Sequence, residues 1–268
     1  MKKTIIYLSD LSTNHLLPLY EIGLFAGFPS PAQDYAASTI NLNVALLIDP
    51  ENTRIIKVQD NDLEGVNIYE GDYAIIATDM VAGIGDKIFC CLNGEYINRI
   101  IERDQTDHSI ILSSTNSKIS PVKINEDIQC VVNGVITYTI TSHIPRYFYP
   151  NEITESKIDI HKLLVRNPAS TFLGIIHGSS MEETGILNGD LAIIDKSLSY
   201  IDGYKALCRI KDKFTIKYLE WSNDKSSLWL KPANKKMPPI KIEKDESVIV
   251  WGIVTHTITP HTRKFNNL

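Results

Sequence analysis

Short runs of apolar and β-branched residues, separated by turn residues, make up most of the chain. The pairs Asn93-Gly94, Asp202-Gly203 and Pro238-Pro239 are among the turn signals between these runs. Runs of this length between turn signals are typical of strands in antiparallel sheets. The pattern predicts strands at residues 73–77, 87–92, 110–112, 131–140, 191–195, 205–210, 228–230 and 248–258.

Two further segments favour helix. They are residues 41–48 and 159–166, and each is followed two residues later by a proline, Pro50 and Pro168. A proline disfavours the helical conformation of the residue before it, so both helices are expected to end there. The sequence therefore predicts a mainly β fold with very little helix.

The predicted elements occur twice. Residues from about 40 to 140 superimpose without a gap on residues from about 158 to 258, at an offset of 118. Gly71-Asp72 falls on Gly189-Asp190, and Gly134 falls on Gly252. The chain is thus predicted to contain two tandem copies of one β domain, each large enough to bury its own core.

We predict three regions from this repeat: an N-terminal arm at residues 1–35, a first domain at 36–143 and a second domain at 144–268. The connection near residues 143–156 contains Pro145 and Pro150 and has no clear period. The arm is too short for a helix-turn-helix reader, which needs several packed helices.

The net charge of −5 and the scattered lysines and arginines argue against direct, sequence-specific DNA binding and favour a protein partner. We expect no membrane span and no signal peptide, and therefore a cytoplasmic protein. The four cysteines and seven histidines lack metal-ligand spacing, so no metal and no cofactor are predicted.

The differences between the two copies indicate the chemistry. Ser180 lies 37 residues before Lys217, which stands in an apolar stretch. A serine becomes a good nucleophile when a base removes its proton, and a buried lysine can be that base if its pKa is lowered enough. Such a pair means little by itself, because serines and lysines are common surface residues.

The first copy gives this pair its weight, because both members are altered there together. At the same offset Ser180 falls on Asp62 and Lys217 falls on Arg99. An arginine remains protonated in proteins, so the first copy lacks a proton acceptor. We predict that Asp62 and Arg99 form a buried or half-buried ion pair instead.

These residues resemble a family: the self-cleaving Ser-Lys proteins typified by UmuD and by the C-terminal domain of LexA. The similarity is carried by Gly178-Ser179-Ser180-Met181, by Phe214-Thr215-Ile216-Lys217 and, most specifically, by the stretch at residues 26–35. It covers nearly the whole chain, once per copy, and it implies LexA/UmuD C-terminal-type β domains.

The resemblance implies cleavage between Ala26 and Gly27, with Ser180 as nucleophile and Lys217 as general base. The backbone N–H groups of Ser179 and Ser180 would be the oxyanion donors. Two small residues also suit a narrow cleft, although an ordinary flexible arm would have them too.

The equivalent bond of the second copy departs from the family pattern. It is Ile144-Pro145, which has no amide N–H after the bond, so we expect it to resist cleavage. The first copy thus supplies the substrate and the second supplies the enzyme. Because members of this family act as dimers, the tandem chain resembles a dimer made covalent, an internal pseudo-dimer that could still form homo-oligomers.

Two partners are implied by resemblance alone: a RecA filament on single-stranded DNA that promotes the cut, and a UmuC-like Y-family polymerase that the trimmed form joins in translesion synthesis. Such a site on such a fold can also belong to repressors. One alternative is therefore a LexA-like regulator without a DNA-binding domain, which modulates a repressor. Another is a binding scaffold that is never cleaved.

Overall fold

Strands dominate the computed structural model, which describes residues 4–22, 38–145, 156–210, 213–224, 226–242 and 248–262. The arm contains β1 (Ile6–Ser9) and β2 (Leu17–Ile22). The first copy contains β3 (Ser38–Ile40), α1 (Leu42–Leu46), β4 (Thr53–Lys57), the 3₁₀ turn η2 (Glu64–Val66), β5 (Tyr73–Ala77), β6 (Lys87–Leu92), β7 (Glu95–Arg103), β8 (Ile110–Ser113), β9 (Val122–Lys123) and β10 (Cys130–Ser142). The second copy contains β11 (Lys157–Ile158), α2 (Ile160–Leu164), β12 (Thr171–Ile176), the 3₁₀ turn η4 (Glu182–Thr184), β13 (Leu191–Asp195), β14 (Lys205–Ile210), β15 (Lys213–Trp221), β16 (Leu228–Lys231), β17 (Ile240–Ile242) and β18 (Val248–Pro260).

The two copies have the same elements at the offset found in the sequence. For example, β10 begins at residue 130 and ends at 142, and adding 118 gives the bounds of β18, 248 and 260. Both predicted helices are present but shorter than predicted, and each is capped by the side chain of the residue before it, Asn41 or Asp159. The mainly β, tandem architecture is therefore confirmed.

A glycine lets the longest strand of each copy bend across its neighbours. A register shift near Gly134 takes β10 from pairing with β6 to pairing with β5. A Cβ atom at Gly134 would lie 2.6 Å from the carbonyl oxygen of Ala77, and one at Gly252 would lie 3.0 Å from that of Asp195. Because both positions leave so little room for a side chain, the match of Gly134 with Gly252 in the repeat has a structural cause.

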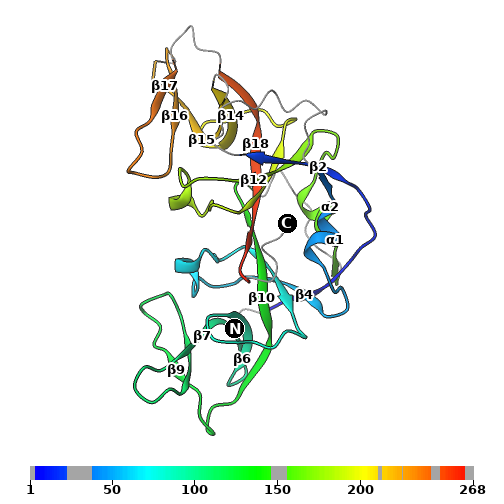
Figure 1. Ribbon diagram of the computed structural model, residues 1–268, viewed down its shortest axis with the longest axis vertical. Coiled ribbons are helices and arrows are strands. Elements are labelled where there is room, and N and C mark those ends of the chain that lie inside the picture. Colours follow the sequence, from blue (N-terminus) through cyan, green and yellow to red (C-terminus); the bar gives the residue numbers. More distant parts are fainter. Residues whose placement is uncertain are drawn as a thin grey trace.

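The copies are joined about a pseudo-twofold axis. Strands β10 and β18 pair in antiparallel fashion, with Ile140 opposite Ile258. These two isoleucines occupy equivalent positions, since 140 plus 118 is 258, so the axis passes through this pair. The green and red strands that form the centre of Figure 1 are β10 and β18. The chain thus forms the predicted internal pseudo-dimer.

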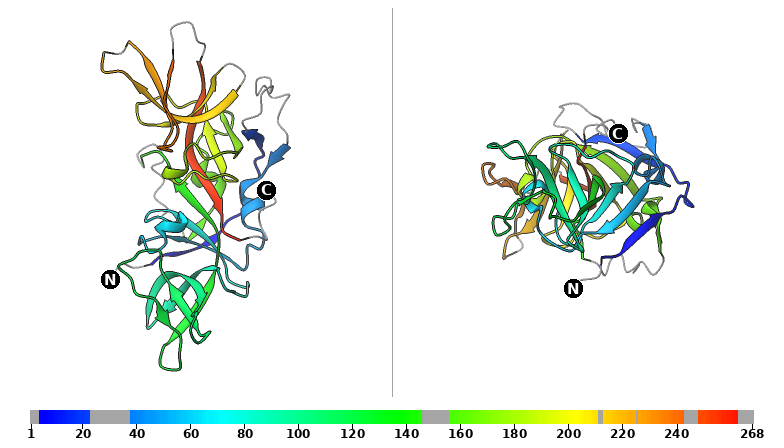
Figure 2. Two further views of the ribbon diagram at one scale, coloured as in Figure 1. Left: turned by 60° about the vertical axis from the view of Figure 1, so that its left-hand side comes forward. Right: turned by 90° about the horizontal axis from the view of Figure 1, so that it is seen from below.

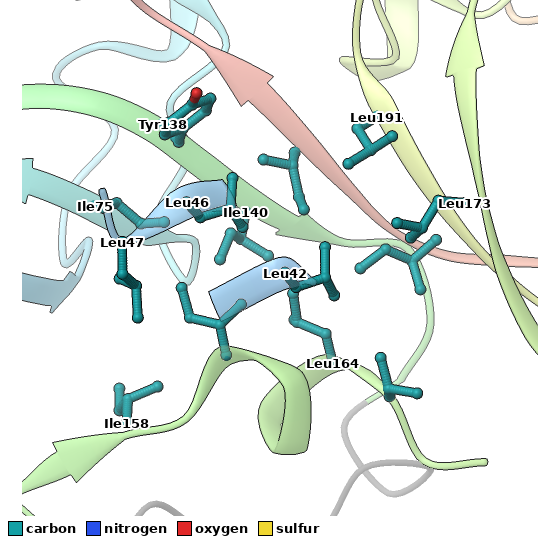
Figure 3. Packing of buried hydrophobic residues seen from close by; sticks show 14 of the residues in the cluster. Leu42, Leu46, Leu47, Ile75, Tyr138, Ile140, Ile158, Leu164, Leu173 and Leu191 are labelled. Carbon is teal, nitrogen blue, oxygen red and sulfur yellow. The ribbon is translucent and has the colours of Figure 1, made fainter. Parts of the chain in front are cut away.

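One hydrophobic core is shared by both copies and the arm. Leu42, Ile75 and Ile140 come from the first copy, and Leu164 and Leu191 come from the second (Figure 3). Tyr7, Leu17 and Leu19 of the arm belong to the same cluster. Because burying each large apolar side chain contributes about 1.5–3 kcal/mol, this cluster fixes the two copies against each other.

The sequence predicted an arm but not its strands. Strand β1 pairs with β4 and β11, and β2 pairs with β3 and β12, so the arm lies within the sheets of both copies. Strands this short give a weak periodic signal, and most of their partners lie far away in the chain. The predicted domain boundaries at residues 35/36 and 143/144 remain predictions. Within the described residues, no helix is long and apolar enough to cross a membrane.

Polar contacts between the two helices are concentrated on Asn43. Its Oδ1 accepts hydrogen bonds from the backbone N–H groups of Ile160 (2.9 Å) and His161 (3.3 Å), and its Nδ2 donates to Asp159 Oδ1 (2.9 Å). Asn43 is 1% exposed. One side chain therefore satisfies several buried groups at the junction of the copies.

We expect Asn43→Ala to lower the free energy of unfolding by about 2–3 kcal/mol, because buried groups would lose their partners. Chemical denaturation measures this change. Val44→Ala is the matched control, since Val44 lies on the same helix and is 65% exposed. Similar stabilities for the two variants would show that Asn43 does not hold the helices together.

Candidate active site

The loop that carries Ser180 follows β12 and is held by backbone and side-chain hydrogen bonds. The carbonyl oxygen of Ser180 accepts from the N–H groups of Ala233 (2.9 Å) and Asn234 (3.1 Å). Asn234 Nδ2 donates to the carbonyl oxygen of Ser179 (3.2 Å) and to Glu182 Oε1 (2.8 Å). The segment after β16 thus fixes the loop on both sides of Ser180.

Lys217 comes from β15 and points at this loop. Its Nζ lies 2.8 Å from Ser180 Oγ, 2.7 Å from Thr215 Oγ1 and 3.0 Å from the carbonyl oxygen of Ile216. Lys217 is 6% exposed, and burial lowers its pKa to about 8. A lysine with this pKa has a neutral fraction large enough at mildly alkaline pH to accept a proton.

The three contacts of Lys217 suit both protonation states, because the charged amine can donate a hydrogen bond to each oxygen. The neutral amine has two N–H bonds and one lone pair. If the N–H bonds point to Thr215 Oγ1 and to the carbonyl oxygen of Ile216, the lone pair faces the hydroxyl of Ser180. The arrangement can therefore take the proton of Ser180 as its oxygen attacks a carbonyl carbon.

Sequence reasoning did not single out Thr215 or Asn234. Thr215 lies two residues before Lys217 on one strand, so both side chains lie on the same face. Its equivalent in the first copy is Ile97, because 97 plus 118 is 215, and this polar-to-apolar difference was a usable signal. Asn234 matches Asn116 in the repeat, and the structure now gives this match a role in holding the loop.

The equivalent site of the first copy keeps the scaffold and changes the chemistry. The carbonyl oxygen of Asp62 accepts from the N–H groups of Thr115 (2.9 Å) and Asn116 (3.3 Å), as that of Ser180 does in the second copy. Arg99 Nη1 donates to Asp62 Oδ2, and their side chains are 8% and 13% exposed. The predicted ion pair is therefore present and largely buried.

The remaining predicted site residues are placed only in part. Gly178, just before the predicted oxyanion donors Ser179 and Ser180, has a φ of 102°. Among the residues that the structure describes, no acceptor is hydrogen-bonded to the N–H of Ser179 or Ser180. The predicted cleavage site, Ala26-Gly27, lies outside the described residues.

Comparisons with known proteins agree with the duplicated architecture. The family model described as Peptidase S24-like matches residues 18–137 and again residues 135–255. Protein MucA of Salmonella typhimurium is 35% identical over 108 residues, which are 40% of this chain and 72% of MucA. Protein SamA of Salmonella typhimurium is 30% identical over 104 residues, which are 39% of this chain and 70% of SamA.

Repressors belong to the same set of relatives. The LexA repressor of Glaesserella parasuis is 36% identical over 93 residues, which are 34% of this chain and 44% of the repressor. Together, the two matches of the family model span most of the chain. This protein belongs to the Peptidase S24-like family, whose domain it contains twice in tandem.

Proposed function

We propose that this protein is a UmuD-like protein of the SOS response that cleaves itself between Ala26 and Gly27, with Ser180 as nucleophile and Lys217 as general base. The observation that carries the proposal is the 2.8 Å contact between Lys217 Nζ and Ser180 Oγ in a largely buried setting. The relatives MucA and SamA support the UmuD-like role, because more than two thirds of each is matched by this chain.

The proposed reaction is hydrolysis of one peptide bond. Ser180 Oγ attacks the carbonyl carbon of Ala26 while Lys217 takes the hydroxyl proton. The nitrogen of Gly27 leaves with that proton, and an ester joins Ser180 to Ala26. Water then hydrolyses the ester, which restores Ser180 and gives a carboxylate at Ala26. The N–H groups of Ser179 and Ser180 would stabilise the oxyanion in both steps.

The position of β2 supports cleavage within one chain. Strand β2 runs parallel to β12, and its last residue, Ile22, is opposite Ile176. Ile22 precedes Ala26 by four residues, and Ile176 precedes Ser180 by four. A fully extended chain can cover about 13–14 Å in four residues, and we propose that the scissile bond reaches the nucleophile loop of its own chain.

We expect the first-order rate of cleavage to be independent of protein concentration, because substrate and catalyst belong to one molecule. Intact mass spectrometry over time, at protein concentrations that differ widely, measures this rate. A rate that increases with concentration would instead place the arm of one molecule in the site of another.

The pH dependence should follow the neutral fraction of Lys217. Burial lowers the pKa of this lysine to about 8. Only the deprotonated amine is a base, so the rate rises with pH, by about tenfold per unit below the pKa, and levels off above it. A pH series of cleavage rates measures this profile. A rate that does not change between mildly acidic and mildly alkaline pH would exclude Lys217 as the base.

The proposed biological role follows from the relatives and the resemblance. We propose that a RecA filament on single-stranded DNA promotes the cut and that the cleaved protein then binds a UmuC-like Y-family polymerase in the cytoplasm. Faster cleavage with the filament, and capture of such a polymerase by cleaved but not by intact protein, test the two steps. No effect of the filament and no binding of the polymerase would contradict this role.

A further inference from the structure

The proposed cleavage site lies on the connection between two paired strands. Strand β2 pairs in antiparallel fashion with β3, with Leu17 opposite Ile40 and Leu19 opposite Ser38. Residues 23–37, which contain the scissile bond, join these strands. A cut there breaks the covalent connection but none of the described contacts of β2 or β3.

The arm occupies equivalent edges of both copies. In β1, Tyr7 is opposite Ile55 of β4, and in β2, Leu19 is opposite Leu173 of β12. Ile55 and Leu173 are equivalent, since 55 plus 118 is 173. In Figure 1 the blue arm runs along the right-hand side, from the level of β4 up to β2, and Figure 2 shows the same strands from two other directions. One continuous segment therefore completes both sheets.

The arm is bound to the rest of the protein largely through buried apolar side chains. Leu17 is fully buried, and Tyr7 and Leu19 are each 7% exposed. All three pack in the core cluster that also contains residues of both copies. Removing the arm would expose this core to water, which opposes its release.

Hydrogen bonds from the end of β1 and from the segment between β1 and β2 also attach the arm to the rest of the protein. The carboxylate of Asp159 accepts from the N–H of Thr13 (3.1 Å) and the hydroxyl of Ser12 (3.2 Å). Asn43 Nδ2 donates to the carbonyl oxygen of Thr13 (3.2 Å), and Ser9 Oγ donates to that of Pro50 (2.7 Å). The arm thus contacts both helix starts and the first copy along much of its length.

We propose that self-cleavage does not remove the arm: residues 1–26 remain as a bound peptide in a site built by both copies. This inference rests on the proposed function for the position of the cut. The ligand of the site is an extended peptide with apolar residues at the positions of Tyr7, Leu17 and Leu19. The cut would also create a new N-terminus at Gly27, in the part of the chain that continues into β3.

The test separates retention from self-cleavage. In full-length protein carrying Ser180→Ala, residues 23–29 are replaced by the recognition sequence of a site-specific protease, so that the cut is made without the Ser-Lys pair. Native mass spectrometry and size-exclusion chromatography at micromolar concentration then follow the fragments. We expect one species that contains both pieces under native conditions and two separate species in denaturant. Loss of the small fragment under native conditions would overturn the proposal.

Two neighbouring residues give matched variants for the same cut protein. Leu17→Asp places a charge in the core, whereas Leu16→Asp alters a side chain that is 61% exposed. We expect at least tenfold faster loss of the fragment with Leu17→Asp and no change with Leu16→Asp. Equal behaviour of the two would contradict the binding site described above. If the parent protein does not cleave itself, the proposed function fails, but the engineered cut still tests retention.

Discussion

Lys217→Arg is expected to slow self-cleavage by on the order of 10⁴-fold, because a guanidinium stays protonated and cannot take the proton of Ser180. In the first copy Arg99 occupies the equivalent strand position, where Asp62 pairs with it. The second copy has Ser180 in place of that carboxylate, so stability is measured beside the rate to separate a loss of chemistry from unfolding. Rates from intact mass spectrometry, with thermal unfolding of the same samples, measure both properties.

Lys205→Arg is the matched control for this experiment. Lys205 lies on β14, beside β15, and burial also lowers its pKa to about 8. Its Nζ lies 2.7 Å from His143 Nδ1. We expect the control to cleave at a rate within about tenfold of the parent. If Lys217→Arg cleaves as fast as this control, Lys217 is not the general base.

Arg99→Met is expected to destabilise the protein by about 3 kcal/mol, because it leaves the carboxylate of Asp62 largely buried without its partner. Methionine keeps much of the apolar volume of the arginine side chain, so the loss of charge pairing dominates the change. Chemical denaturation measures the free energy of unfolding. A second substitution, Asp62→Leu, should restore much of the lost stability by removing the unpaired charge.

The exposed pair between Lys123 and Asp107 in the same copy is the control. Both side chains are 49% exposed. Water and salt screen such a pair, so Lys123→Met should leave the unfolding midpoint unchanged. If Arg99→Met changes stability as little as Lys123→Met does, the ion pair of Asp62 and Arg99 does not stabilise the first copy.

The duplication explains how much could be predicted from one sequence. Two copies in one chain provide an internal comparison, and the joint change of Ser180 to Asp62 and of Lys217 to Arg99 indicated that each pair lies in contact. In the structure Lys217 Nζ lies 2.8 Å from Ser180 Oγ, and Arg99 forms an ion pair with Asp62. The same comparison could have found Thr215, since its equivalent, Ile97, is apolar. A threonine two residues before a lysine is common in strands, however, and its contact with the amine is visible only in the structure.

The arm could not be predicted in the same way. The repeat of elements begins near residue 40, so β1 and β2 have no second copy for comparison, and both are short. Their stability comes from tertiary partners such as Ile55 and Leu173, which are far from them in the chain. Short strands that complete the sheets of other segments are defined by packing more than by local propensity. For this reason the sequence predicted which residues form an arm, but not that the arm pairs with strands of both copies.

The most direct test of the account is the intact mass of the purified protein over time at mildly alkaline pH, alone and with a RecA filament, beside Ser180→Ala. We predict that the parent is converted into fragments of residues 1–26 and 27–268 and that Ser180→Ala stays whole. Cleavage of Ser180→Ala at the parent rate, or a parent that stays whole under every condition, would contradict the central claim that Ser180 cuts the Ala26-Gly27 bond.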